Sequence, residues 1–106
     1  MALYESTIIL RPDLATNEVE KIAGDFEEVI SNNQGKVVEK QLLGLRELAY
    51  KVHKHKKGYY VFFGLEGNGD TILELKRKYK INENVIRDLT VNVDKINSNL
   101  IDFGDK

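Results

Sequence analysis

The chain has 106 residues, of which 42% are hydrophobic and 31% charged, which is enough for one compact domain with a core and too little for two. It has no cysteine, which excludes a disulfide framework and a cysteine-ligated zinc site. No apolar run approaches the roughly 20 residues that cross a bilayer, and the N-terminus lacks the basic-then-apolar pattern of a secretion signal, so we expect a cytoplasmic protein.

Charge is distributed unevenly along a chain whose formal net charge is only -1. Residues 1–35 carry two basic and seven acidic side chains, residues 36–80 carry eleven and five, and residues 81–106 carry three and five. A compact protein with this pattern can present a basic side to RNA while its acidic side faces solvent.

The first predicted elements are a strand over residues 2–10 and a helix from Leu14 to about Asn33. Thr7, Ile8 and Ile9 favour extended structure, and apolar residues recur at helical spacing through the second segment. Asp13 or Thr16 is expected to cap the helix.

A hairpin follows, with strands over residues 36–52 and 58–66 and a lysine- and histidine-rich connection. Gly44 marks a bulge or bend in the first of these strands. Alternation places Val61, Phe63 and Leu65 on one face of the second strand and the aromatic residues Tyr60 and Phe62 on the other.

The last elements are a helix from Asp70, which resembles a capping residue, to about Lys80, and a strand over residues 85–93. Alternation in this strand indicates that the face of Leu89, Val91 and Val93 is covered and the other is wet. We expect one domain over residues 1–94 and an extended C-terminal tail over residues 95–106.

The order strand, helix, strand, strand, helix, strand predicts an α+β fold of the ferredoxin-like, split βαβ type. Its four-stranded antiparallel sheet carries both helices on one face. The other face stays open, and Tyr60 and Phe62 there would expose a large apolar area unless a partner binds.

No residue pattern in the chain indicates catalysis, a metal or a cofactor. The histidines, His53 and His55, lie among lysines, with no carboxylate or thiol close in sequence. The turn at Gly67–Gly69 lacks the residues of a phosphate-binding loop. We therefore expect a protein that is not an enzyme.

The most informative segment is the basic hairpin connection, because residues 49–64 contain no acidic side chain. Its lysines suit RNA phosphates, but they are equally consistent with a solubilising tip that discourages edge aggregation. The aromatic residues that follow could stack on bases, contact a protein or pack in the core.

The segment Gly44-Leu45-Arg46-Glu47-Leu48-Ala49-Tyr50, followed by Val52 and Lys54, resembles the bacterial small-subunit ribosomal protein six family. Further similarity lies at Tyr4-Glu5, Arg11-Pro12-Asp13-Leu14, Lys57-Gly58-Tyr59 and Asn84-Val85-Ile86-Arg87. In this chain Lys51 replaces the family's usual proline, and the tail lacks the glutamate-rich extension of some members.

The resemblance implies a non-enzymatic constituent of the bacterial small ribosomal subunit that binds central-domain rRNA together with ribosomal protein eighteen. Matched positions expected to face RNA are Arg46, Tyr50, Lys54 and Arg87. The charge pattern adds Lys51, Lys56 and Lys57. The candidates for contact with the protein partner are Tyr60, Phe62, Leu100, Ile101 and Phe103.

Two other functions fit the predicted fold. A ferredoxin-like oligomerising or ligand-sensing module would use the open sheet face for self-association. A hydrolase of the acylphosphatase type would need a glycine-rich anion loop after the first strand, and Arg11 is followed there by Pro12, Asp13 and Leu14 instead.

Overall fold

The computed structural model describes residues 1–52 and 55–97, and the side chains of residues 49–52 are outside that description. The elements, in chain order, are β1 (Ala2–Leu10), α1 (Thr16–Asn32), β2 (Lys36–Val52), β3 (His55–Gly67), α2 (Gly69–Ile81) and β4 (Val85–Val93).

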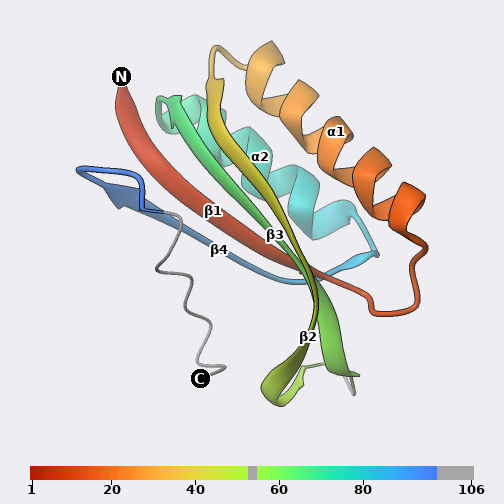
Figure 1. Ribbon diagram of the computed structural model, residues 1–106. Helices are drawn as coiled ribbons and strands as arrows, with labels where there is room; N and C mark the ends of the chain where they lie inside the picture. The colour runs from red at the N-terminus through yellow and green to blue at the C-terminus, as the bar shows by residue number, and fades with distance from the viewer. Residues whose placement is uncertain (53–54, 98–106) are drawn as a thin grey trace.

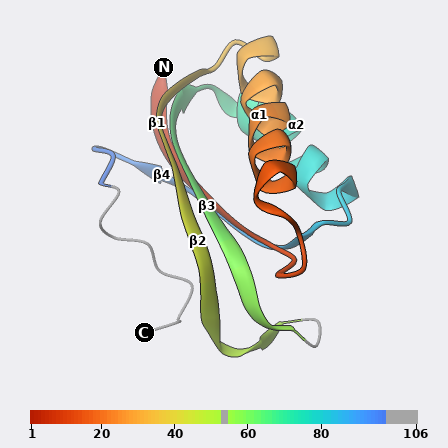
Figure 2. The ribbon, with the colours of Figure 1, turned by 45° about the vertical axis from the view of Figure 1, so that its right-hand side comes forward.

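The four strands form one antiparallel sheet in the order β2-β3-β1-β4. Figures 1 and 2 show both helices on one face of this sheet, while the other face carries no helix. The predicted ferredoxin-like α+β fold is therefore confirmed. We call the face without helices the open face.

The main core lies between the sheet and the helices. The buried side chains that form it are Ile8, Leu10, Leu14, Val19, Ile22, Ala23, Phe26, Ile30, Val61, Phe63, Leu65, Ile72, Leu75 and Tyr79. Phe26 of α1 meets Tyr79 of α2 edge to face, with ring centroids 4.7 Å apart, so the two helices also pack on each other.

A buried chain of hydroxyl groups ties α2 to two strands. The Tyr79 hydroxyl lies 2.7 Å from Ser6 Oγ, which lies 2.9 Å from Thr90 Oγ1. Burial raises the pKa of the Tyr79 phenol well above its usual range, although its hydrogen bond with Ser6 opposes this effect.

Both helices begin differently from the prediction. Ala15 is the N-cap of α1, and its backbone N–H donates to Glu18 Oε1 at 2.8 Å. Asn68 is the N-cap of α2, and its side-chain oxygen accepts from the Thr71 backbone N–H at 3.0 Å. Capping by Asp13, Thr16 or Asp70 was thus a wrong expectation.

The predicted irregularity at Gly44 is confirmed. Its φ is +90°, and the β2–β3 register shifts between Leu42 and Gly44. The positive φ strains any residue with a Cβ, which explains the glycine. Beyond this bulge β2 continues, and β3 already begins at His55, three residues before the predicted start at Gly58.

Candidate nucleic-acid interface

The far ends of β2 and β3 form a two-stranded arm. The last pair that joins β3 to β1 is Tyr59 with Leu10, whereas β3 residues before Tyr59 pair only with β2. We call residues 46–57 the arm, of which residues 53 and 54 are not described. In Figures 1 and 2 the arm projects beyond the rest of the sheet.

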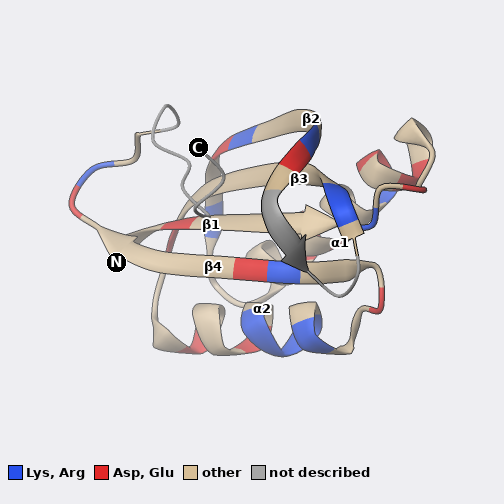
Figure 3. Ribbon diagram, turned by 90° about the horizontal axis from the view of Figure 1, so that it is seen from below, with Lys and Arg blue, Asp and Glu red and all other residues tan. Residues whose placement is uncertain are grey.

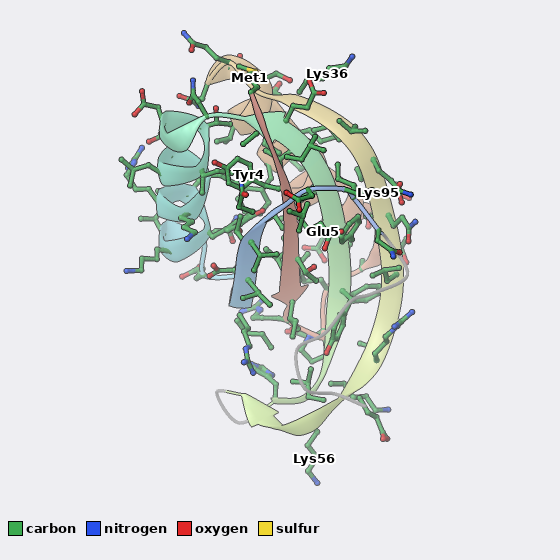
Figure 4. All side chains as sticks on the ribbon, turned by 90° about the vertical axis from the view of Figure 1, so that its left-hand side faces the viewer. Met1, Tyr4, Glu5, Lys36, Lys56 and Lys95 are labelled. Carbon is green, nitrogen blue, oxygen red and sulfur yellow. The ribbon has the colours of Figure 1, made fainter. Side chains whose placement is uncertain are left out.

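The arm carries exposed lysines. Lys56 and Lys57 are exposed, and Figure 4 shows Lys56 pointing away from the end of the arm. Lys51 belongs to the described backbone of β2, whereas Lys54 and the side chains of Tyr50 and Lys51 lie outside the description. Figure 3 shows that α2, on the helix side of the sheet, also carries Lys and Arg residues.

Two arginines border the open face beside the arm. The Arg46 guanidinium of β2 lies 5.8 Å from the centre of the Tyr60 ring, within the range of a cation–π contact. Cross-strand pairs join Tyr60 to Ile9 and Ile9 to Arg87 of β4. Directly paired residues share a face, so Arg87 lies on the same face, two strands from Tyr60.

Tyr60 and Phe62 lie on the face opposite the main core, as predicted, but the expectation that they are exposed was wrong. Their exposed fractions are 0% and 1%. Tyr60 packs with Ile9 in a second small core, against which Leu43, Leu48 and Ile86 also pack. Side chains from all four strands thus surround Tyr60 on this face.

Gly58 allows the base of the arm to pass close to β1. A Cβ at this position would strike Ile9 Cγ2 and would lie 3.2 Å from the Leu10 carbonyl oxygen. Because Ile9 is fully buried, it has no free space into which to move. The close approach of β3 to β1 at the base of the arm therefore requires a glycine at this position.

Two exposed apolar residues of the open face lie on β4, and their exposure was not predicted. Leu89 pairs with Thr7, and Val91 pairs with Glu5, which places both on this face. Their exposed fractions are 43% and 41%, so the expected cover over this face of the strand is absent among the described residues. Alternation correctly placed them on a common face, but the expectation that this face is covered was wrong for Leu89 and Val91.

Within the described parts of the chain, no group of three or more His, Cys, Asp or Glu is arranged to hold a metal ion. Neither described helix has the length and hydropathy needed to cross a membrane. The predicted partner residues Leu100, Ile101 and Phe103 lie outside the described residues, as does His53.

A family model described as ribosomal protein S6 matches residues 3–92. The chain belongs to the ribosomal protein S6 family. It is 48% identical over 98 residues to the small ribosomal subunit protein bS6 of Rickettsia felis, covering 92% of this chain and 81% of that protein. The Rickettsia prowazekii protein of the same name is 45% identical with the same coverage.

The structure supports the same membership. The crystal structure of 30S ribosomal protein S6 from Thermotoga maritima superposes with a TM-score of 0.83 at 26% sequence identity and covers 87% of each chain. This membership makes the chain a protein of the small subunit of the cytoplasmic ribosome, as the resemblance of the Gly44–Tyr50 segment predicts.

Proposed function

We propose that this S6-family chain binds central-domain rRNA of the small subunit together with ribosomal protein eighteen. The observation that carries the proposal is the arm, which extends beyond the sheet with exposed lysines beside two arginines of one sheet face. The role is to position RNA and protein relative to each other, and it involves no catalysed reaction.

Phosphates are the natural ligands of this end of the molecule. Lysine and arginine side chains on a projecting hairpin can follow an RNA backbone without reading its sequence. Arg46 and Arg87 lie on the two edge strands, so they can contact phosphates on either side of the small Tyr60 core. The residues proposed to face RNA are Arg46, Tyr50, Lys51, Lys54, Lys56, Lys57 and Arg87.

The protein partner is proposed to cover the open face. Leu89 and Val91 are its exposed apolar contacts, and the buried Tyr60 and Phe62 support the surface from within. The tail residues Leu100, Ile101 and Phe103 are proposed to add to this interface. A partner that brings its own basic residues would also offset the acidic net charge of this chain.

The test compares two variants that each lose three positive charges. The first replaces Lys51, Lys56 and Lys57 of the arm with alanine, and the second does so with Lys76, Lys78 and Lys80 of α2. Binding to a central-domain rRNA fragment is measured with and without purified ribosomal protein eighteen over a series of salt concentrations. If each arm lysine neutralises one phosphate, the salt slope of the arm variant should be shallower by about 2.7, and its affinity near 0.1 M salt should be lower by about 500-fold.

The α2 variant is the matched control, because its lysines lie on the helix layer rather than on the arm. It is expected to keep the salt slope of the unmodified chain. Equal losses in both variants would mean that net charge alone drives binding. Absence of RNA binding with and without the partner protein, together with a concentration-dependent dimer in sedimentation, would favour the oligomerising module instead.

A further inference from the structure

The chain does not run away from the sheet after β4 but turns back over the open face. Asp94 and Lys95 form a bend, and the next two residues, Ile96 and Asn97, lie against β3 and β1. Figure 4 shows this segment crossing the sheet beside the labelled Glu5. We call residues 94–97 the strap.

Among the described residues, contacts from both Ile96 and Asn97 hold the strap on the sheet. The backbone N–H of Asn97 donates to Glu5 Oε2 of β1 at 2.6 Å. The Ile96 side chain occupies the space above Gly64 of β3, where an added Cβ would lie 2.7 Å from Ile96 Cγ2 and 3.0 Å from its Cδ1. Gly64 and Glu5 are directly paired across β3 and β1, so the two contacts form one site.

The site has the features of a docking position for an extended segment. A carboxylate accepts a backbone N–H, which gives a charge-assisted hydrogen bond, and the missing Cβ of the neighbouring glycine leaves a notch for a branched aliphatic side chain. Within 4 Å of a Cβ at Gly64, the three nearest atoms all belong to Ile96. This notch is therefore filled by the strap.

The strap shares the open face with the exposed residues of β4. Val91 pairs directly with Glu5, and Leu89, two residues before Val91 on the same strand, pairs with Thr7. A protein partner that covers Leu89 and Val91 would thus meet the strap at its border. The hydrogen bond from Asn97 to Glu5 is exposed, so this contact can open without unfolding of the domain.

We propose that the strap is a cis-acting competitor, docked at Glu5 and Gly64, that must leave before a protein partner covers this end of the open face. The proposal rests on the proposed function for the identity of that partner. A strap that is closed about ten times as often as it is open would lower the apparent affinity for the partner about elevenfold.

The test is a double-mutant cycle on the full-length chain. Gly64→Ala places a methyl group where Ile96 sits, and Ile96→Ala removes the side chain that fills the notch. The first readout is hydrogen exchange of the Asn97 amide, followed by NMR in the free protein. We expect about tenfold protection in the unmodified chain and its loss in each single variant.

The cycle separates strap release from other effects of the methyl group. In the Ile96→Ala background, Gly64→Ala should change the exchange of Asn97 no further, because the two changes act through the same contact. Ile81→Ala is the matched control, since it truncates an exposed isoleucine on α2 and leaves the strap intact. Glu5→Ala should also release Asn97, whereas Glu5→Gln keeps an acceptor oxygen and should retain part of the protection.

The second readout is the affinity for purified ribosomal protein eighteen. Release of the strap by Gly64→Ala or Ile96→Ala should raise this affinity by up to about tenfold, and Ile81→Ala should not. An unprotected Asn97 amide in the unmodified chain would overturn the docked strap whatever the partner does. Unchanged or lower affinity after release would overturn the competition.

Failure of the proposed function gives a different result. If no variant binds the partner protein, the partnership and the competition fall together, while the exchange of Asn97 still decides whether the strap docks on Glu5 and Gly64. The two readouts therefore assign any failure to one proposal or to the other.

Discussion

The two ends of the open face differ in charge and in the way they are covered. At the arm end, a row of paired residues crosses the sheet through Gly44, Tyr60, Ile9 and Arg87, with Arg46 above the Tyr60 ring. Four residues along β1, about 13 Å away, the corresponding row at the strap end contains Glu39, Gly64, Glu5 and Val91.

The difference separates two kinds of contact on one surface. The arm end presents arginines around the sealed Tyr60 core, which suits phosphates and prevents the Tyr60 ring from acting as an open platform. The strap end presents carboxylates and a notch, which suit a backbone N–H and an aliphatic side chain. A sheet face without helices is therefore not one uniform docking surface.

The largest expected effect comes from Gly58→Ala at the arm end. The new methyl group would strike the side chain of Ile9, which is fully buried and pinned by the second core. Overpacking of this kind costs about 2 kcal/mol. Denaturant unfolding should show a lower midpoint with an unchanged slope, and full stability of this variant would show that the close approach of β3 to β1 is not maintained.

A smaller effect is expected on the covered side of the sheet, behind the strap end. Tyr79→Phe removes the hydroxyl that meets Ser6, at a cost of about 1 kcal/mol, because Ser6 stays buried and keeps its contact with Thr90. The same phenol makes stability depend on alkaline pH. Its pKa is raised in the folded chain, so above its ordinary value of 10.0 the unfolded chain loses the proton first.

Because the pKa of Tyr79 is higher in the folded chain than in the unfolded chain, stability decreases as the pH rises. The contribution of Tyr79 is fully present below about pH 10, and it falls by about 1.4 kcal/mol for each pH unit above that value. Unfolding of the Tyr79→Phe variant should lack this part of the decline. Parallel curves for the two proteins between about pH 10 and pH 11 would contradict the raised pKa.

Local patterns predicted the elements of the fold well. Hydrophobic periodicity and turn residues located β1, β2 and β4 at their observed bounds, and Gly44 marked the observed bulge. The caps were wrong because a turn, rather than a residue type, decides which side chain reaches the free N–H groups. Asn68 and Ala15 take these positions through hydrogen bonds with Thr71 and Glu18.

The sequence predicted which face of the sheet carries the residues of the candidate site, but it did not predict which of these residues are buried. Alternation along β3 is local, and it correctly set Tyr60 and Phe62 opposite the main core. The burial of Tyr60 depends on distant residues such as Ile9 and Ile86, which no local pattern connects. The strap could not be predicted for the same reason, because the Asn97–Glu5 hydrogen bond joins residues 92 positions apart.

The smallest expected effect on global stability is that of Gly64→Ala, and it completes the comparison with Gly58→Ala. Both glycines lie on β3 and both face the open side, but the methyl group at Gly64 meets only the strap among its nearest neighbours. The alanine also restricts the unfolded chain, which offsets part of the lost contact. The free energy of unfolding should therefore stay within about 0.5 kcal/mol of the unmodified value, measured by the same denaturant titration. A loss as large as that of Gly58→Ala would mean that the strap belongs to the cooperative core of the domain, and a segment of that kind could not open to admit a partner.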